Sequence, residues 1–251
     1  MSDGLKSLVG LARSLVIYRR PGRQRSLRSF YKAFVQPGDL VFDVGAHLGD
    51  RTSAFAALGA TVVALEPQPN LFGWLKRLTS SDDQVTCLDQ AVGSEPGSVE
   101  MVTSLANPTV ASLSKEWTSR VSRGQAGFEG VQWDRRVSVD VTTLDCLIDR
   151  YGEPAFCKID VEGFEPEVLK GLSRSLPALS VEFLNGALDQ AIACVDRLEA
   201  LARYRYQVVE GERRTFFLPE WLGADEVRQW LADGAAGLAS GDLYARRDDD
   251  R

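Results

Sequence analysis

The sequence has no long hydrophobic run and no paired cysteines. No apolar stretch approaches the roughly 18 residues that a membrane-spanning helix needs, so no transmembrane segment is expected. The four cysteines lack the spacing of a zinc site or a redox motif, and the N-terminal residues lack the cleavage site of a secretory signal. These absences predict a soluble cytoplasmic protein with reduced cysteines.

Charge is distributed unevenly along a chain whose composition is otherwise ordinary. Hydrophobic residues make up 44% and charged residues 25%, as is typical of a globular protein. Residues 1–32 carry a net charge of +7 and the remainder −13, within a total of −6. We expect a basic N-terminal helical arm over 1–36, one domain over 37–246 and a disordered charged tail over 247–251. The acidic domain argues against nucleic-acid binding.

Hydrophobic patterning predicts an α/β domain. Residues 40–44 form a continuous apolar run, as expected of a strand buried on both faces of a parallel sheet. Further strands are expected at 61–65, 84–88, 156–160, 178–183, 206–209, 215–218 and 243–246, and helices at 52–58, 70–78, 143–151, 166–172, 188–202 and 224–233. This alternation predicts a Rossmann-like, mostly parallel sheet with helices on both faces.

Two regions fall outside this alternation. Near the N-terminus, apolar spacing predicts a helix over 5–16 that Pro21 and Gly22 end, and a second helix over 27–35. In the middle lies a predicted insertion over about 97–141. Its ends, 98–103 and 135–141, alternate like antiparallel strands, and the residues between them, 107–130, are expected to form a loop over the functional site.

The first strand runs into the turn Asp43-Val44-Gly45-Ala46-His47-Leu48-Gly49-Asp50. Glycines at 45 and 49 let the backbone approach a ligand, and an ammonium group of that ligand would suit Asp43. The NAD pattern of three glycines is absent, because His47 and Asp50 occupy the later glycine positions. The acidic turn favours a cationic sulfonium cofactor over a dinucleotide, although a tight βα connection without any ligand remains an alternative.

The next two strand ends also carry polar residues. Glu66, followed by Pro67, lies where a carboxylate accepts hydrogen bonds from ribose hydroxyls. The third strand ends in Asp89, Gln90 and Ala91, which can supply contacts to the edge of an adenine ring. Three successive strand tips thus predict a nucleoside site along one edge of the sheet.

Five blocks together resemble FkbM-type methyltransferases, in the same order and over roughly residues 38–185. They are 42–49 (FDVGAHLG), 65–67 (LEP), 91–93 (AVG), 143–145 (TLD) and 158–165 (KIDVEGFE). The resemblance implies a class I methyltransferase sheet with a reversed final strand. It also implies methyl transfer from S-adenosylmethionine, usually to oxygen on sugars or natural products.

The resemblance assigns roles along the cofactor. It places Asp43, Gly45 and Gly49 at the methionine side, with His47 in the same loop where relatives often have Asn. It makes Glu66 the ribose acceptor, next to Pro67. The segment Asp89 to Ala91 then takes the adenine side.

A second row of charges follows the strand at 156–160. A hydroxyl acceptor must lose a proton during methyl transfer, so a base or a metal is expected near the methyl group. Lys158, Asp160 and Glu162 alternate along this strand end, and Glu182 lies at the end of the next strand. Asp160, Glu162 and Glu182 are candidate ligands of a divalent cation. In the alternative, Asp160 caps a helix and Lys158 merely pairs with one of the acids.

His47, the only histidine, is a second candidate base because its pKa suits proton transfer. The resulting hypothesis is O-methylation of a small hydroxylated acceptor such as a sugar or natural product, with Asp160 also near the cofactor. The alternatives are an NAD-dependent enzyme and a noncatalytic cofactor-binding protein on the same scaffold. A homo-oligomer is left open.

Overall fold

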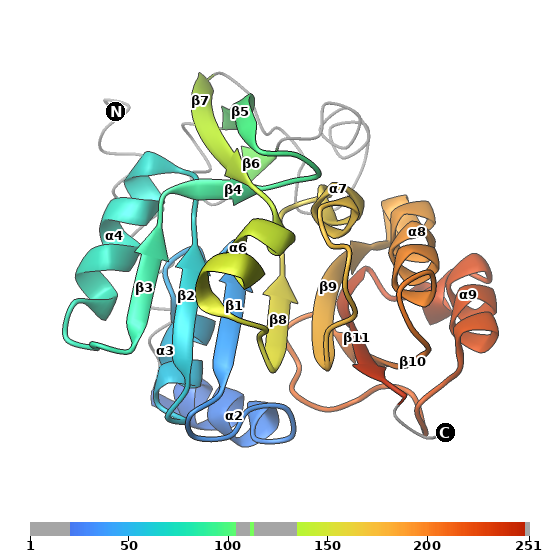
Figure 1. Ribbon diagram of the computed structural model, residues 1–251. Coiled ribbons are helices and arrows are strands. Elements are labelled where there is room, and N and C mark those ends of the chain that lie inside the picture. Colours follow the sequence, from blue (N-terminus) through green and yellow to red (C-terminus); the bar gives the residue numbers. More distant parts are fainter. Residues whose placement is uncertain (1–20, 104–110, 113–134, 249–251) are drawn as a thin grey trace, which may run out of the picture.

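The computed structural model describes residues 21–103, 111–112 and 135–248. It contains a seven-stranded sheet in the order β10-β11-β9-β8-β1-β2-β3 (Figure 1). Its strands are β1 (Leu40–Val44), β2 (Thr61–Leu65), β3 (Val85–Leu88), β8 (Phe156–Ile159), β9 (Ala178–Leu184), β10 (Tyr204–Glu210) and β11 (Ser240–Arg247). Only β11 runs antiparallel to its neighbours, β9 and β10. The predicted Rossmann-like sheet with a reversed last strand is confirmed.

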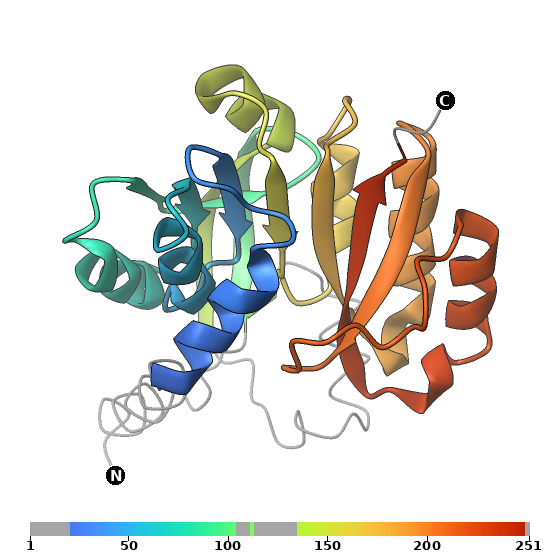
Figure 2. The same cartoon turned by 90° about the horizontal axis from the view of Figure 1, so that it is seen from below.

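Helices cover both faces of this sheet. They are α2 (Pro21–Tyr31), α3 (Asp50–Ala56), α4 (Pro69–Thr79), α6 (Leu144–Tyr151), α7 (Glu165–Lys170), α8 (Leu188–Glu199) and α9 (Ala224–Ala232), with short 3₁₀ turns η1 (Asn185–Ala187) and η2 (Ala235–Gly237). Buried residues of α6 to α9 share one core cluster, and those of α2 and α3, together with Leu75 of α4, share a second. Figure 2 shows α6 and α2 on opposite sides of the strands.

The N-terminal part of the described chain differs from the prediction. Pro21 and Gly22 begin helix α2 instead of ending a helix, because proline is well suited to a first helical turn, where no backbone donor is needed. Tyr31 packs against Phe55 with ring centroids 4.6 Å apart. Residues 21–35 of the expected arm therefore pack onto the sheet, while the predicted helix over 5–16 lies outside the described residues.

A second, four-stranded sheet lies beyond the carboxyl ends of β1 to β3 (Figure 1). It consists of β4 (Gln90–Val92), β5 (Gly97–Thr103), β6 (Ala111–Ser112) and β7 (Arg135–Thr142) in the order β4-β7-β5-β6. The pairs β5–β7 and β5–β6 are antiparallel, as the insertion was predicted to be. Of the expected loop over 107–130, only residues 111–112 are described, and these form β6.

The C-terminal part differs from the prediction at two points. Instead of a strand over 215–218, Phe216 forms an isolated bridge to Val209 and packs its ring against Trp221. Arg247, expected to begin a disordered tail, ends β11, and the backbone N–H of Asp248 donates to the Arg203 carbonyl at 2.9 Å. Backbone pairing thus orders the first two residues of that tail.

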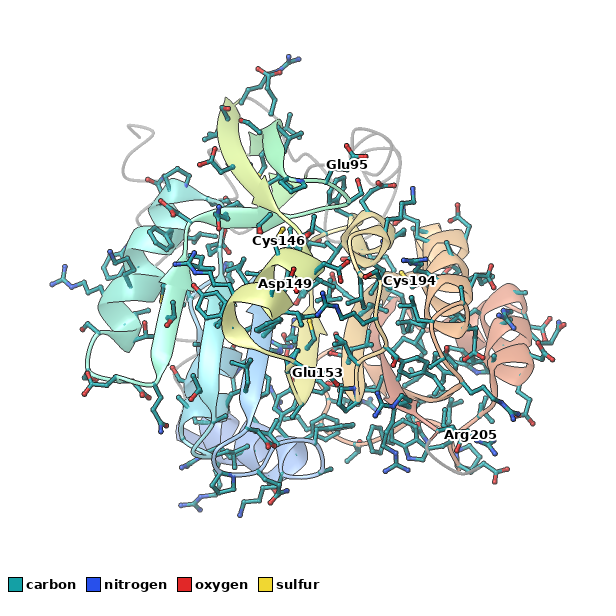
Figure 3. All side chains as sticks on the ribbon, in the orientation of Figure 1. Glu95, Cys146, Asp149, Glu153, Cys194 and Arg205 are labelled. Carbon is teal, nitrogen blue, oxygen red and sulfur yellow. The ribbon has the colours of Figure 1, made fainter. Side chains whose placement is uncertain are left out.

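The four cysteines are unpaired, as their spacing predicted. Cys146 and Cys194, labelled in Figure 3, lie on the separate helices α6 and α8. Cys157 is fully buried in β8, and burial raises the pKa of its thiol. No helix in the described part of the chain has the length and apolarity to cross a bilayer.

Candidate active site

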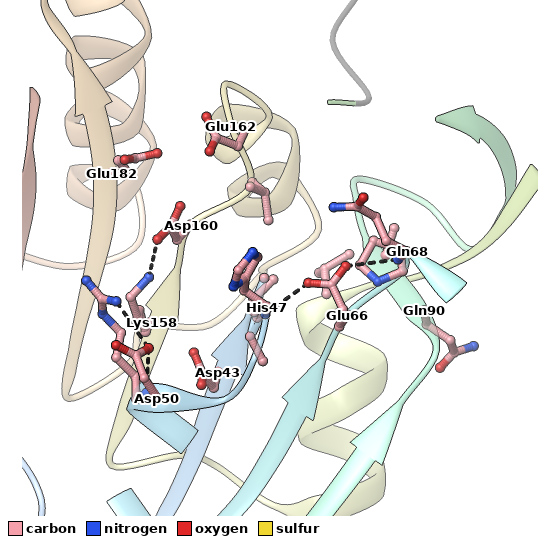
Figure 4. A pocket seen from close by; sticks show the side chains of 18 of the residues that line it. Asp43, His47, Asp50, Glu66, Gln68, Gln90, Lys158, Asp160, Glu162 and Glu182 are labelled. Carbon is pink, nitrogen blue, oxygen red and sulfur yellow. Dashed lines mark hydrogen bonds and ion pairs between the residues drawn. The ribbon is translucent and has the colours of Figure 1, made fainter. Parts of the chain in front are cut away.

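A cavity of about 260 Å³, here called the strand-tip cavity, opens where β1, β2, β8 and β9 end (Figure 4). The carboxyl ends of parallel strands meet at one edge, which is where open α/β sheets bind ligands. The predicted residues that line it are Asp43, Gly45, His47, Glu66, Pro67, Gln90, Ala91, Lys158, Asp160, Glu162 and Glu182. Two predicted cofactor residues, Gly49 and Asp89, do not line it.

The glycines of the first turn have packing roles. A Cβ on Gly45 would lie 1.8 Å from the Asp160 carbonyl oxygen, so only glycine lets the ends of β1 and β8 approach this closely. Gly49 precedes α3 with a φ of 76°, and a Cβ there would lie 2.7 Å from Leu75 Cδ1. Gly49 therefore serves the packing of α3 on α4, and Asp89 is exposed beyond the end of β3.

Asp43 is buried at the end of β1 with one oxygen unsatisfied. Its Oδ2 accepts a 2.5 Å hydrogen bond from the Thr52 hydroxyl. Its Oδ1 has no hydrogen-bond partner among the described residues. Burial raises the pKa of this carboxyl, while the Lys158 ammonium partly opposes that shift. A donor group on a ligand would supply the missing partner of Oδ1.

Glu66, at the tip of β2, connects this strand end to the loop after β1 through hydrogen bonds. Its Oε2 accepts from the backbone N–H of His47 at 2.9 Å, and its Oε1 accepts from that of Gln68 at 2.9 Å. Each carboxylate oxygen keeps a further lone pair for a ligand hydroxyl. Burial raises the pKa of Glu66 to about 7, even though both hydrogen bonds act to lower it.

Two lining residues hold a backbone conformation that side chains disfavour. Among the described residues, four non-glycine residues have a positive φ, and two of them, His47 (52°) and Glu162 (54°), line the strand-tip cavity. Such conformations cost about 1–3 kcal/mol each and concentrate at functional sites. Burial lowers the pKa of the His47 imidazole, which favours its neutral form.

Lys158 and Asp160 form an ion pair at the end of β8. The Lys158 Nζ lies 2.6 Å from Asp160 Oδ2, and the lysine side chain is only 1% exposed against 26% for the aspartate. Burial alone would raise the pKa of Asp160, but the Lys158 ammonium lowers it to about 2. Asp160 is therefore ionised at neutral pH. The predicted alternative that Lys158 pairs with an acid is confirmed.

The helix-capping alternative for Asp160 is wrong. The residue that precedes α7 is Phe164, and the loop after β8 is instead held by Glu165. Its Oε1 accepts from the backbone N–H groups of Val161 at 3.0 Å and Gly163 at 3.3 Å. Asp160 is thereby left facing the strand-tip cavity (Figure 4).

The Asp160 carboxylate of this pair lies close to two further carboxyl groups. Asp160, Glu162 and Glu182 can each offer one oxygen, and these oxygens lie within 4.8 Å of one another. Burial and the neighbouring Asp160 raise the pKa of both Glu162 and Glu182. The same three residues were predicted as cation ligands, but the Lys158 ammonium already balances Asp160. Metal binding therefore stays a prediction, and none of the contacts among the described residues depends on a bound cation.

The geometry can be compared with known proteins. The family described as "Methyltransferase FkbM domain" matches residues 43–236. The chain belongs to this family. It is 27% identical over 144 residues to the hexuronic acid methyltransferase AglP of Haloferax volcanii, over 57% of this chain. It spans 53% of that relative's length.

Solved methyltransferase structures are also similar to this FkbM domain. A TehB-like SAM-dependent methyltransferase from Corynebacterium glutamicum is 12% identical, with 96% of each chain covered and a TM-score of 0.48. A precorrin-6y C5,15-methyltransferase from Geobacter metallireducens is 13% identical, with 90% and 87% covered and a TM-score of 0.46.

The strand-tip cavity of this FkbM domain fits the S-adenosylmethionine that the resemblance implied. The buried Oδ1 of Asp43 lacks a donor, which the cofactor's ammonium group would provide. Carboxyl oxygens of Asp43 and Glu66 and the ionised carboxylate of Asp160 line the cavity, which suits a sulfonium more than a pyrophosphate. Asp50 of the same turn already has a cationic partner, because Arg23 donates to its Oδ2 at 2.6 Å.

Several lining residues of the FkbM domain were missed. Arg51 and Glu212 both face the cavity, although Glu212 comes from the turn after β10 and is remote in sequence. Their guanidinium and carboxylate lie 3.4 Å apart. Met101 of β5 adds an apolar wall. Arg51 could have been predicted to line the cavity, because it directly follows the glycine turn. No feature of the local sequence predicts the position of Glu212.

Proposed function

We propose that this chain transfers a methyl group from S-adenosylmethionine to a hydroxyl oxygen of a sugar-like acceptor. The proposal depends on one observation: the same cavity is lined by the groups expected to bind the cofactor and by a candidate proton acceptor. Asp43 and Glu66 lie at the strand tips where the cofactor was expected, and Asp160, fixed by a buried lysine, faces the same space. The FkbM family membership supports this reading.

On the cofactor side, Asp43 accepts a hydrogen bond from the ammonium group, and Glu66 accepts hydrogen bonds from the ribose hydroxyls. Both carboxyls are already held by Thr52 and by backbone N–H groups, so little side-chain freedom is lost on binding. Gln90 and Ala91 border the space left for the adenine ring. When bound, the cofactor supplies the electrophilic methyl group.

On the acceptor side, Asp160 accepts the hydrogen bond of the acceptor hydroxyl and takes its proton as the oxygen attacks. Lys158 fixes the orientation of Asp160 and keeps it ionised through the 2.6 Å contact. His47, which burial keeps neutral, is the second candidate for the proton.

The acceptor class is proposed from one relative. AglP, at 27% identity, is described as a hexuronic acid methyltransferase, which favours an oxygen of a sugar over a nitrogen atom. The strand-tip cavity is polar on its acceptor side, where Asp160, Glu162 and Glu182 face it, as binding a hydroxylated ring requires.

The proposal is tested by incubating the purified chain with methyl-labelled S-adenosylmethionine and a panel of hexuronides, neutral hexosides and amino sugars. Mass spectrometry then locates the label. We expect a labelled methyl group on an ether oxygen of a sugar, and none in the absence of enzyme. Label on nitrogen alone would replace the O-methylation proposal, and binding of the cofactor without any labelled product across a broad acceptor panel would favour a noncatalytic protein.

A further inference from the structure

Three arginine side chains converge on a single carboxylate oxygen at one edge of the strand-tip cavity. The Nη2 atoms of Arg23, Arg51 and Arg214 lie 3.0, 3.4 and 3.4 Å from Oε2 of Glu212. The three arginine side chains are only 10%, 13% and 18% exposed, whereas Glu212 is 53% exposed. An exposed carboxylate thus contacts three guanidinium groups that are themselves largely covered.

This arginine cluster has fewer acceptors than its donors need. Asp50 already accepts two hydrogen bonds from Arg23 through one oxygen. Among the described residues, the Nε atoms of Arg51 and Arg214 are buried without any hydrogen-bond partner. Burial and the neighbouring Arg23 also lower the pKa of Arg214. Buried donors of this kind are costly unless an acceptor reaches them.

The cluster lies on the acceptor side of the cavity. Arg51 and Glu212 line the cavity itself, and Arg51 is one of the cations that lower the pKa of Asp160, after Lys158. Glu66 and Gln90 lie at the other side of the same space (Figure 4). A group bound by Arg51 would therefore belong to the molecule that presents its hydroxyl to Asp160.

We propose that Arg51 and Arg214, supported by Arg23, bind a carboxylate or phosphate of the acceptor, and that Glu212 occupies this anion site until the acceptor displaces it. Guanidinium groups suit this task because their planar donors match the geometry of both anions. The inference rests on the proposed function in taking the bound anion to be the methyl acceptor, and it specifies that acceptor as acidic.

The test measures binding of three sugars by calorimetry with S-adenosylhomocysteine present: glucuronate, glucose 6-phosphate and glucose. We expect at least one charged sugar to bind about tenfold or more tightly than glucose, and the tighter of the two identifies the anion. Arg214→Gln should remove most of that difference, because it deletes a charge-assisted donor. Glu212→Gln should increase affinity severalfold, because the internal competitor loses its charge.

Neighbouring residues provide matched controls. Arg213 and Glu210 pair with each other at 2.9 Å, and the Arg213 side chain is 70% exposed. Arg213→Gln and Glu210→Gln make the same charge changes and should leave sugar affinity within about twofold. Thermal unfolding and S-adenosylhomocysteine affinity of each variant check that the fold is retained.

Two results would overturn the inference. One is equal affinity of the wild-type chain for all three sugars. The other is an equal effect of Glu212→Gln and Glu210→Gln, as expected if the cluster only joins α2, α3 and the turn after β10. Either result, obtained while S-adenosylhomocysteine still binds, removes the anion site and leaves the proposed function intact. Failure of S-adenosylhomocysteine to bind would instead remove the proposed function.

Discussion

Glu66 at the end of β2 is held by two backbone N–H groups, whereas Asp160 at the end of β8 is held by the buried ammonium of Lys158. The two carboxyls face one cavity, yet burial raises the pKa of Glu66 to about 7 while Lys158 lowers that of Asp160 to about 2. Two neutral donors do not fully offset the cost of burying Glu66, whereas the Lys158 ammonium in direct contact does so for Asp160, whose side chain is also less deeply buried. A cation in direct contact and partial exposure together keep Asp160 ionised.

The substitution Asp160→Asn tests whether the ionised carboxylate at the end of β8 accepts the proton. Loss of the ionised proton acceptor should lower turnover by about a hundredfold or more, because general base catalysis contributes roughly 10²–10⁴-fold. S-adenosylhomocysteine affinity should stay within severalfold. Single-turnover methyl transfer measures the first quantity and calorimetry the second.

Glu167→Gln is the matched control, because it removes a carboxylate from an exposed pair with Lys170 on the following helix. Its turnover should equal that of the wild type. Unchanged turnover in Asp160→Asn would take Asp160 out of the mechanism and leave His47 as the base.

The two strand tips meet at Gly45, and Gly45→Ala tests that junction. The added Cβ would lie 1.8 Å from the Asp160 carbonyl oxygen at a φ of 80°. We expect the free energy of unfolding to fall by about 4 kcal/mol, at the upper end for single substitutions. Urea denaturation measures the change. Gly97→Ala, where no atom lies within 4 Å, should cost far less, and equal effects would contradict the close approach.

Glu66→Ala tests the cofactor side alone. It removes a charge-assisted acceptor, so S-adenosylhomocysteine binding should weaken by about 1–3 kcal/mol. Turnover at saturating cofactor should change less than in Asp160→Asn. Titration calorimetry that finds wild-type affinity in Glu66→Ala would reject the ribose assignment.

The smallest expected effect is the pH dependence of stability without ligand. The raised pKa of Glu66, about 7 against an ordinary 4.5, means that the folded state keeps a proton that the unfolded chain releases above pH 4.5. This stability is fully present below pH 4.5 and is lost as pH rises to about 7. Glu165, also raised to about 7, adds to the effect.

His47 has the opposite effect, because burial lowers its pKa. Its contribution to the stability of the fold is present above pH 6.5 and is lost as the pH falls below that value. The lowered pKa of Asp160 matters only below pH 4. Burial also raises the pKa of further carboxyls, namely Asp43, Glu162, Glu182 and Asp242. The buried carboxyls outweigh the single imidazole, and the thermal midpoint should therefore rise from pH 7.5 to 5.5. Glu66→Gln should reduce this rise, and a falling midpoint would contradict the burial argument.

Much of the fold and about half of the cavity could be predicted because strand tips in a βα pattern occupy one edge of the sheet. Asp43 lies near the end of an apolar strand, and Glu66 and Asp160 each directly follow one, so their placement needed only the alternation. Asp89 follows a strand as well, but its side chain is exposed, and strand position alone does not reveal which way a residue beyond the last pair points.

The remainder depends on contacts between distant segments. The Arg23–Asp50 pair and the approach of Glu212 to Arg51 join residues 27 and 161 positions apart, which no local pattern encodes. Gly49 was assigned to the ligand because packing and ligand approach require the same backbone freedom. Pro21 was taken as a helix end because proline is compatible with both the end and the first turn of a helix.

Binding of an S-adenosyl cofactor at the tips of β1 and β2 is tested by titration calorimetry of the ligand-free chain with S-adenosylhomocysteine and, separately, with NAD. We expect saturable one-to-one binding of S-adenosylhomocysteine, weakened in Glu66→Ala, and no measurable binding of NAD. Tight binding of NAD with none of S-adenosylhomocysteine would contradict this expectation.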